Sequence, residues 1–166
     1  ETFLKLAKLF SKTAIEVCDG QQLDVDFEVR NDVTIEEYIK MISLKTSVLI
    51  GAALKMGAIV SKASETEAQK LYDFGLNLGI AFQLQDDYLD TFGNPETFGK
   101  QVGGDIIENK KTYLFLKALE LSNPEDKNIL MQLFQEKLAQ HEEKIEKTRA
   151  LFNKYEIPNH IKNQII

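Results

Sequence analysis

The stretch LYDFGLNLGIAFQLQDDYLD, residues 71–90, decides how this sequence is interpreted. Its apolar residues recur at helical spacing in two stripes. Together these stripes cover almost the whole circumference of the helix. The stripes consist of Leu71, Phe74, Leu78 and Phe82, and of Leu76, Ile80 and Leu84. A helix that is apolar all round belongs inside a helical bundle. Gly75 and Gly79 lie four residues apart, so a neighbouring helix could approach this one closely.

Three carboxylates, Asp86, Asp87 and Asp90, follow at the end of this helix. The helix dipole is negative there and disfavours each acid by about 0.3–1 kcal/mol at an exposed site. Acids four apart also repel one another. A hard divalent cation removes both costs, because Mg²⁺ prefers oxygen ligands and is usually held by one or two carboxylates together with water and phosphate. The cluster therefore predicts a Mg²⁺ site; a solvated helix end is the simpler alternative.

Lysines follow the acids along the chain. Lys100 lies in a glycine-rich segment, and Lys110 and Lys111 lie in the first turns of a predicted helix. Cations at a helix N-terminus oppose the dipole unless an anion is nearby. A metal-bound diphosphate between the acids and the lysines would satisfy both groups. The alternative for each lysine alone is a solvated surface charge.

Composition limits the remaining possibilities. With 166 residues and 43% hydrophobic content, the chain fits one globular domain with a sizeable core. Its net charge of −6 argues against sequence-independent binding of nucleic acid or anionic lipid. The single Cys18 excludes an intramolecular disulfide and indicates a reducing compartment, for which we expect the cytoplasm. Without a run of about 18 apolar residues or a basic-then-apolar start, we expect neither a spanning helix nor a signal peptide.

Apolar spacing near 3.6, with only three prolines, predicts an all-α fold of five or six helices. The first is expected over Thr2–Cys18, with residues 19–32 ending it. The second is expected to start at Thr34, whose side chain forms a capping box with Glu37. The third is expected to be capped by Ser64 and to continue to the carboxylates.

The rest of the chain predicts a loop and two more helices. Residues 91–104 contain four of the nine glycines and a proline, which is typical of a loop. DIIE predicts a capping box from Asp105 to Glu108, opening a helix that continues to residue 120. Residues 122–126 break the chain again, and Lys127–Asn153 predicts one outer amphipathic helix.

Four segments together resemble a known family. DGQQLD (19–24) looks like a GQxxD element, YIKMISLKTSVL (38–49) like a YxxMxxxKT helix, and FQLQDDYLD (82–90) like a second aspartate-rich motif. GKQVGGDIIENKKT (99–112) is similar to a GKxxGxDxxxxKxT loop and helix. In this order and spacing they resemble the C-terminal half of the trans-type isoprenyl diphosphate synthases, the family of farnesyl and geranylgeranyl diphosphate synthases. The resemblance covers most of the chain as a single all-α domain fragment.

The resemblance implies an all-α bundle of the isoprenoid synthase type around a deep pocket, and a homodimer. It implies a Mg²⁺-dependent prenyltransferase that condenses an allylic diphosphate with isopentenyl diphosphate. The implied Mg²⁺ ligands are Asp86, Asp87 and Asp90. The residues implied to contact the allylic diphosphate are Lys45, Lys100 and Lys110. Thr46 and Gln83 are implied to place polar oxygens near the developing cation, and Gln21 and Asp24 to line the pocket.

One departure from the family pattern is clear. The family's first aspartate-rich motif and the basic residues that bind isopentenyl diphosphate do not occur in these 166 residues. We therefore expect the chain to be inactive alone. A non-catalytic regulatory subunit of a prenyl synthase and a terpene cyclase remain alternatives. A purely structural helical domain does not explain why acids lie at the end of one helix and lysines at the start of the next, where the helix dipole disfavours both. A di-metal oxidase bundle needs ExxH pairs, and neither His141 nor His160 has a Glu three residues before it.

Overall fold

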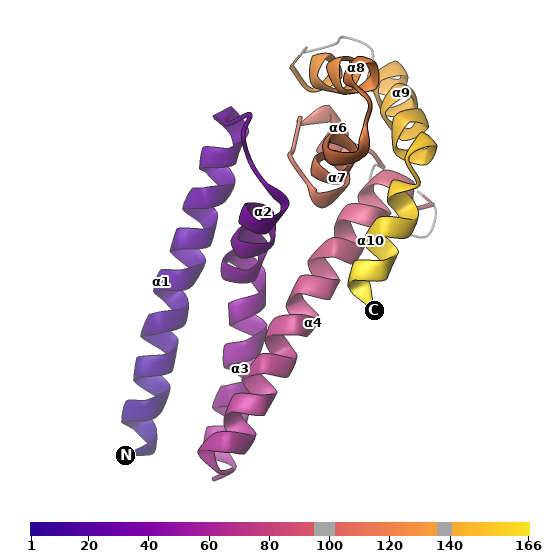
Figure 1. The fold of residues 1–166 in the computed structure, drawn as a ribbon. Coiled ribbons are helices and arrows are strands. Elements are labelled where there is room, and N and C mark those ends of the chain that lie inside the picture. Colours follow the sequence, from indigo (N-terminus) through magenta and orange to yellow (C-terminus); the bar gives the residue numbers. More distant parts are fainter. Residues whose placement is uncertain (95–101, 136–140) are drawn as a thin grey trace. The chain divides into compact units, whose positions relative to one another are not determined.

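The computed structural model describes residues 1–94, 102–135 and 141–166, and every regular element in these ranges is a helix (Figure 1). The all-α prediction is therefore confirmed. The chain forms two compact units, which we describe separately. The first comprises residues 1–29 and 39–83, and the second comprises residues 30–38 and 84–166.

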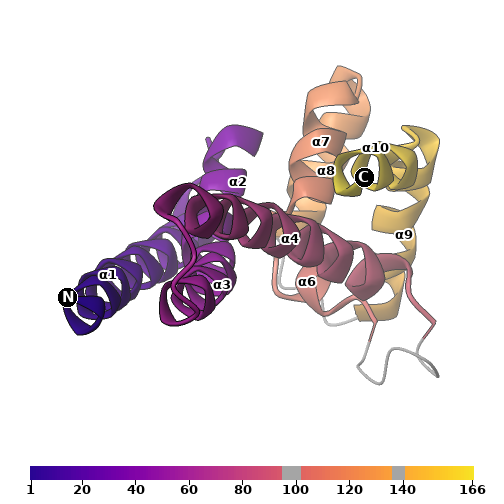
Figure 2. The same cartoon turned by 90° about the horizontal axis from the view of Figure 1, so that it is seen from below.

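The first unit is built on three long helices. They are α1 (Thr2–Val29), α3 (Val48–Val60) and the part of α4 (Glu65–Phe92) up to Gln83. A short helix, α2 (Ile35–Ile42), leads into a π-helical turn at Ser43–Ser47, which continues directly into α3. Helix α1 packs along both the π-helical turn and α3 (Figures 1 and 2).

Helix α1 corrects the first predicted helix boundary. It continues through the expected break and ends at Val29. Gly20 is buried, and a Cβ atom there would overlap the backbone of Leu44 and Lys45. Gly20 therefore lets the backbone of the π-helical turn approach α1 and does not end the helix.

Glycines on α4 have the same role, as predicted. A Cβ atom on Gly75 would lie 2.7 Å from Gly51 Cα, and one on Gly79 would lie 2.5 Å from Ser47 Cα. Both distances are shorter than a carbon–carbon contact of about 3.5–4.0 Å. The small residues thus bring α4 close to α3 and the π-helical turn.

The expectation that α4 is buried on all sides is wrong for the described structure. One stripe is exposed by 41–62%, and it consists of Leu71, Phe74, Leu78 and Phe82. In the second stripe, by contrast, Leu84 is buried. Apolar periodicity shows which sides of a helix are apolar but not whether a partner covers them.

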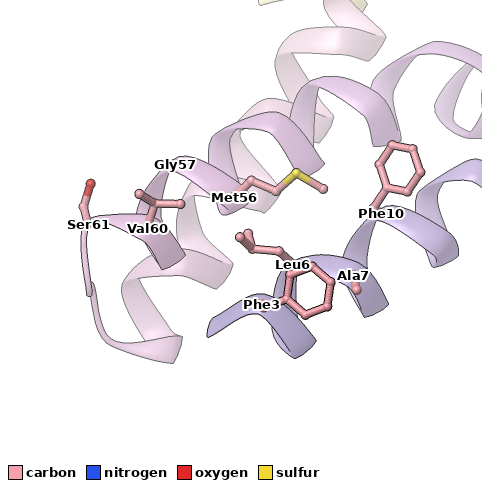
Figure 3. Close-up of a pocket in the computed structure, with 8 residues that line it drawn as sticks. All are labelled: Phe3, Leu6, Ala7, Phe10, Met56, Gly57, Val60 and Ser61. Carbon is pink, nitrogen blue, oxygen red and sulfur yellow. The ribbon is translucent and has the colours of Figure 1, made fainter. Parts of the chain in front are cut away.

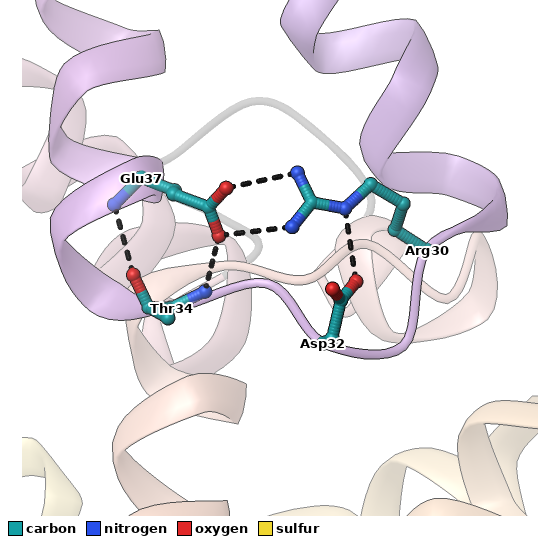
Figure 4. A network of polar contacts seen from close by, with 4 residues as sticks. All are labelled: Arg30, Asp32, Thr34 and Glu37. Atoms are coloured by element: carbon teal, nitrogen blue, oxygen red, sulfur yellow. Dashed lines mark hydrogen bonds and ion pairs between the residues drawn. The ribbon is translucent and has the colours of Figure 1, made fainter.

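The predicted capping box at Thr34 and the predicted helix cap at Ser64 are both present. The Thr34 amide donates to Glu37 Oε2 at 3.0 Å, and the Glu37 amide donates to Thr34 Oγ1 at 3.2 Å. Arg30 extends this network, since its guanidinium donates two hydrogen bonds to Glu37 and one to Asp32 (Figure 4). Ser64 forms the equivalent pair with Glu67 and caps α4.

The second unit contains shorter helices. They are α6 (Gly104–Ile107), α7 (Tyr113–Leu121), α8 (Pro124–Gln135), α9 (His141–Lys154) and α10 (Ile157–Ile165). Helix α9 packs against α6, α7, α8 and α10 and so lies at the centre of this unit. The most deeply buried apolar side chains come from all of the last four helices: Leu114, Leu130, Phe152, Ile157 and Ile161.

Several boundaries here differ from the predictions. The helix expected from Asp105 to residue 120 is split into α6 and α7, and α6 begins after Gly103, whose φ of 90° is left-handed. The single helix expected over Lys127–Asn153 is wrong, because α8 and α9 pack against each other. Helix α4 extends into the expected loop as far as Phe92, and residues 95–101 of that loop lie outside the described ranges. The described part of the chain therefore has more than five or six helices.

One stretch of the described residues, Ile35–Val60, is long and apolar enough to cross a membrane by length and composition alone. A core helix of a soluble protein passes the same test. The π-helical turn lies within this stretch, and Gly51, Ala52 and Ala58 are buried along it. Only 33% of its most apolar window is buried, so packing within the described structure accounts for part of this apolar composition.

Candidate functional site

The three predicted metal ligands lie on the last turns of α4, but their surroundings differ. Asp86 and Asp90 are four residues apart, share one side of the helix and are partly buried. Asp87 is only 3% exposed, and the hydroxyl group of the buried Tyr38 donates a hydrogen bond to its Oδ2 atom. The structure therefore separates Asp87 from the other two carboxylates.

Asp90 connects the end of α4 to the segment before and inside α6. Its Oδ2 atom accepts the backbone amide of Asp105 at 3.0 Å, and its carbonyl accepts the amide of Gly103 at 2.6 Å. Burial raises the pKa of the Asp90 carboxyl, and the amide of Asp105 partly opposes this. A cation beside Asp90 would favour its charged form.

Lys110 follows α6 and faces the same acidic segment. Its Nζ atom lies 3.0 Å from both Asp105 Oδ1 and Glu108 Oε2. Burial lowers the pKa of Lys110, but its contacts with Asp105 and Glu108 outweigh this and raise the pKa above its ordinary value. With a side chain 52% exposed, Lys110 is a permanent cation that a ligand can reach.

In the first unit, the π-helical turn carries two more predicted site residues. Lys45 Nζ donates to Asp24 Oδ2 on α1 at 2.5 Å. Thr46 Oγ1 lies 3.4 Å from Gln83 Oε1 on α4, a long hydrogen bond. Such π-turns are rare and occur frequently at functional sites, because they change the direction of side chains along an otherwise regular helix.

The structure says less about two other predicted site residues, Gln21 and Lys100. Gln21 is exposed on α1, and Lys100 lies outside the described residues. Within the described ranges, no three histidine, cysteine or acidic side chains are grouped as they would be around a metal ion. The donor set at the end of α4 still fits Mg²⁺, since this ion needs only one or two carboxylates when phosphate and water fill its other positions.

The first unit also contains an apolar hollow of about 810 Å³ between the start of α1 and the end of α3 (Figure 3). It is lined by Phe3, Leu6, Ala7, Phe10, Met56, Gly57, Val60 and Ser61. None of these residues is among the predicted site residues. The hollow is an uncovered apolar face, and it has no charged group that could bind a diphosphate.

Comparison with known proteins agrees with the motifs. The sequence profile of the family described as polyprenyl synthetase matches residues 1–152. The chain belongs to the polyprenyl synthetase family. It is 46% identical over 121 residues to a short chain isoprenyl diphosphate synthase of Methanothermobacter thermautotrophicus, covering 73% of this chain and 37% of that protein. It is 40% identical over 143 residues to a geranylgeranyl diphosphate synthase of Sulfolobus acidocaldarius, covering 86% and 43%.

Solved structures show the same fold. A crystal structure of a geranylgeranyl pyrophosphate synthase matches with a TM-score of 0.93 and 50% identity, over 99% of this chain and 51% of that one. A geranylgeranyl pyrophosphate synthetase from Pyrococcus horikoshii matches with a TM-score of 0.89 and 33% identity, over 99% and 50%. The isoprenoid synthase fold is thereby confirmed, and the chain spans between 37% and 51% of the length of these polyprenyl synthetase relatives.

Sequence reasoning did not assign a site role to two residues of this polyprenyl synthetase chain. Tyr38 was expected only as the tyrosine of the YxxMxxxKT motif, although a buried tyrosine hydroxyl needs a hydrogen-bond partner and this requirement was the available signal. Asp105 was expected to cap a helix, but its carboxylate instead contacts Lys110 and its amide contacts Asp90. The aspartate of the GKxxGxDxxxxKxT pattern was the available signal for Asp105.

Proposed function

We propose that the complete protein is a trans-prenyltransferase that joins an allylic diphosphate to isopentenyl diphosphate and extends the allylic chain by one C5 unit. Membership of the polyprenyl synthetase family supports this. So does a crystal structure of a Caulobacter crescentus polyprenyl synthase described as complexed with calcium and isoprenyl diphosphate, which matches with a TM-score of 0.88 at 28% identity. Because the chain spans about half of its relatives, the activity is proposed for the whole protein.

The observation that carries the proposal is a continuous path of contacts in the second unit. Asp90 binds the amide of Asp105, and the Asp105 carboxylate binds Lys110. The second aspartate-rich motif and the lysine of the following motif are therefore connected through one intermediate residue. A site with acids and a reachable cation this close together suits a diphosphate that arrives with a divalent metal.

The proposed reaction gives a separate task to six of the predicted site residues. When the allylic carbon–oxygen bond breaks, the electron pair leaves with the diphosphate, and the ammonium groups of Lys45 and Lys110 stabilise that developing negative charge. Asp86 and Asp90 would hold Mg²⁺, which when bound supplies further positive charge to the same oxygens. Thr46 and Gln83 would direct oxygen atoms toward the allylic cation. The double bond of isopentenyl diphosphate then forms the new carbon–carbon bond, and a proton is lost.

Two further features belong to the proposal. A homodimer and a cytoplasmic location are consistent with the family resemblance and with the single Cys18, respectively. Lys100 is retained as a diphosphate ligand because of its place in the GKxxGxDxxxxKxT pattern. Asp87 is proposed to support the metal site by holding Tyr38 rather than by binding the ion directly.

The test is an assay of the complete protein with isopentenyl diphosphate and dimethylallyl, geranyl or farnesyl diphosphate in the presence of Mg²⁺. Asp86→Ala is the site variant, and Asp73→Ala is the matched control, because Asp73 is an exposed aspartate on the same helix. We expect elongated product from the wild type and from D73A. We expect D86A to lose about 10²-fold or more in kcat.

Three outcomes would count against the proposal. If the folded wild type elongates no primer but cyclises an allylic diphosphate, the protein is a terpene cyclase. If it binds primers but converts none, it is a non-catalytic subunit. Equal rates for D86A and D73A would show that the carboxylates at the end of α4 hold no catalytic metal.

A further inference from the structure

Lys144 on α9 is buried, which is unusual for a lysine. It is 2% exposed, and its Nζ atom donates a hydrogen bond to Asn109 Oδ1. The same ammonium group lies 5.3 Å from the centroid of the Phe134 ring, within the range of a cation–π interaction. Burial lowers the pKa of Lys144. Burying an ammonium group costs free energy unless the group is hydrogen-bonded. Asn109 Oδ1 is the acceptor that the described structure gives to Lys144.

Asn109 forms the turn that ends α6. Its φ of 60° is left-handed, a conformation that asparagine tolerates better than most residues. Its amide donates to the Ile106 carbonyl at 3.2 Å, and the next amide, that of Lys110, donates to the Asp105 carbonyl at 2.9 Å. This pair of hydrogen bonds around a left-handed residue defines a Schellman turn.

The Schellman turn fixes the backbone from which the Lys110 side chain extends. Its second hydrogen bond uses the backbone of Lys110 itself, and its acceptor is the carbonyl of the residue that the Lys110 ammonium also contacts. An anchor on Asn109 therefore restrains Lys110 directly. We infer that Lys144 is a positioning residue, which holds the left-handed Asn109 turn and so keeps the Lys110 ammonium in place to receive a diphosphate.

Other contacts of α9 support this role independently. Ile145 packs against Gly103, where a Cβ atom would lie 2.6 Å from Ile145 Cδ1. Arg149 Nε donates to the carbonyl of Thr91, near the end of α4, at 2.6 Å. Helix α9 thus contacts the end of α4 at Thr91 and, at Gly103, the residue from which the segment carrying Asp105 and Lys110 begins. Lys144 supplies the third contact, on the turn itself.

The inference rests on the proposed function, and its test uses the complete protein. Lys144→Met keeps most of the side-chain volume but removes the ammonium group. Lys147→Met is the matched control, because Lys147 is on the same helix, is 57% exposed and pairs only locally with Glu143. Asn109→Gly keeps access to the left-handed conformation but removes the acceptor. Amide hydrogen exchange, calorimetric binding of inorganic pyrophosphate with Mg²⁺, and steady-state kinetics are measured for each variant and for K144M/N109G.

We expect K144M to speed exchange at the amides of Asn109 and Lys110 but not at Leu116 in α7. It should weaken pyrophosphate binding about tenfold, as expected for loss of a charged hydrogen bond. It should raise KM for the allylic diphosphate and leave KM for isopentenyl diphosphate unchanged. The double variant should be no worse than K144M, because both changes break the same contact.

Three results would overturn the inference. If K144M matches K147M in exchange and in pyrophosphate affinity, Lys144 does not position the turn. If exchange rises equally at Leu116, Lys144 only stabilises the whole unit. A wild type that elongates no primer overturns the proposed function as well, whereas the first two results leave elongation by the wild type intact.

Discussion

Tyr38 and Asp87 lie 49 residues apart in the chain and are joined by a hydrogen bond from the tyrosine hydroxyl to the carboxylate, with both residues buried. The bond explains why one of three adjacent acids is inaccessible. It also connects the first turn of α2, which the Thr34–Glu37 capping box fixes, to the carboxylate cluster on α4.

Tyr38→Phe tests this link. Because the substitution removes a donor from a buried carboxylate, we expect the free energy of unfolding of the complete protein to fall by about 1–3 kcal/mol. Urea denaturation measures it. Asp86→Ala is the comparison: it should reduce turnover with little effect on unfolding, because Asp86 is assigned to the ligand rather than to the core. Equal unfolding for Y38F and wild type would contradict a structural role for the hydrogen bond.

Variants of the Lys45–Asp24 ion pair distinguish substrate binding by Lys45 from the contact of Lys45 with Asp24. Lys45→Met should lower kcat/KM for the allylic substrate about 10²-fold, since it removes the charge that we propose stabilises the leaving diphosphate. Asp24→Asn removes only the partner, and such a half-exposed ion pair contributes no more than about 1 kcal/mol, or about fivefold. Lys40→Met, at an exposed lysine of α2, should leave kcat/KM unchanged. A larger loss in D24N than in K45M would show that Asp24, rather than Lys45, contacts the substrate.

The pH dependence of the protein's stability should reflect the titration of Asp126, which lies near the start of α8. Its carboxylate accepts hydrogen bonds from Lys154 and from the Tyr155 hydroxyl, both at 2.5 Å, and these lower its pKa from the ordinary value of 3.8. A lowered pKa of an acid adds stability that is complete above the unfolded value and is lost as pH falls through the folded value. We therefore expect the melting temperature to fall on acidification below about pH 4.

Asp126→Asn removes the group that titrates. The melting temperature of D126N should be lower than that of the wild type at neutral pH, and the two curves should converge in acid. Parallel curves would show that other carboxylates cause the acid sensitivity.

Gly79→Ala tests the close approach of α4 to the π-helical turn. The new Cβ atom would lie 2.5 Å from Ser47 Cα, so backbone must move. We expect a loss of about 1–3 kcal/mol in the free energy of unfolding, as for other overpacked sites. Asn77→Ala, on an exposed position of the same helix, should change it by no more than about 0.5 kcal/mol. Equal unfolding midpoints for the two variants would contradict the close packing.

Local signals predicted local structure well. The capping boxes at Thr34 and Ser64 depend on residues three apart, and both were found. Glycines were harder to interpret from sequence. Gly75 and Gly79 were correctly predicted to allow close packing, but the segment 19–32, which contains Gly20, was predicted to end a helix that in fact continues. Nothing in the sequence next to Gly20 shows that the backbone of Lys45 will lie against it.

The motifs predicted candidate site residues but not their contacts. Asp86, Asp90, Lys45 and Lys110 remain predictions as site residues, and the structure adds that Lys45 pairs with Asp24 and Lys110 with Asp105. The break at Asn109 was missed, because the apolar spacing of residues 113–121 extends back toward Asp105 and a left-handed residue leaves no periodic signal. The carboxylate cluster was predicted to act as one group, whereas Tyr38 separates Asp87 from it.

The π-helical turn at Ser43–Ser47 restricts how the length of this chain can change. Such a turn holds one residue more than an α-helical turn, so deleting one residue from it would restore α-helical geometry and redirect the side chains within the turn. Lys45 and Thr46 would then not both keep their contacts with Asp24 and Gln83, and the backbone at Leu44 and Lys45 that lies against Gly20 would shift. Substitutions can accumulate in this segment singly, but an insertion or deletion would disturb the packing and the site in one step. Its length should therefore be constant even where its residues vary.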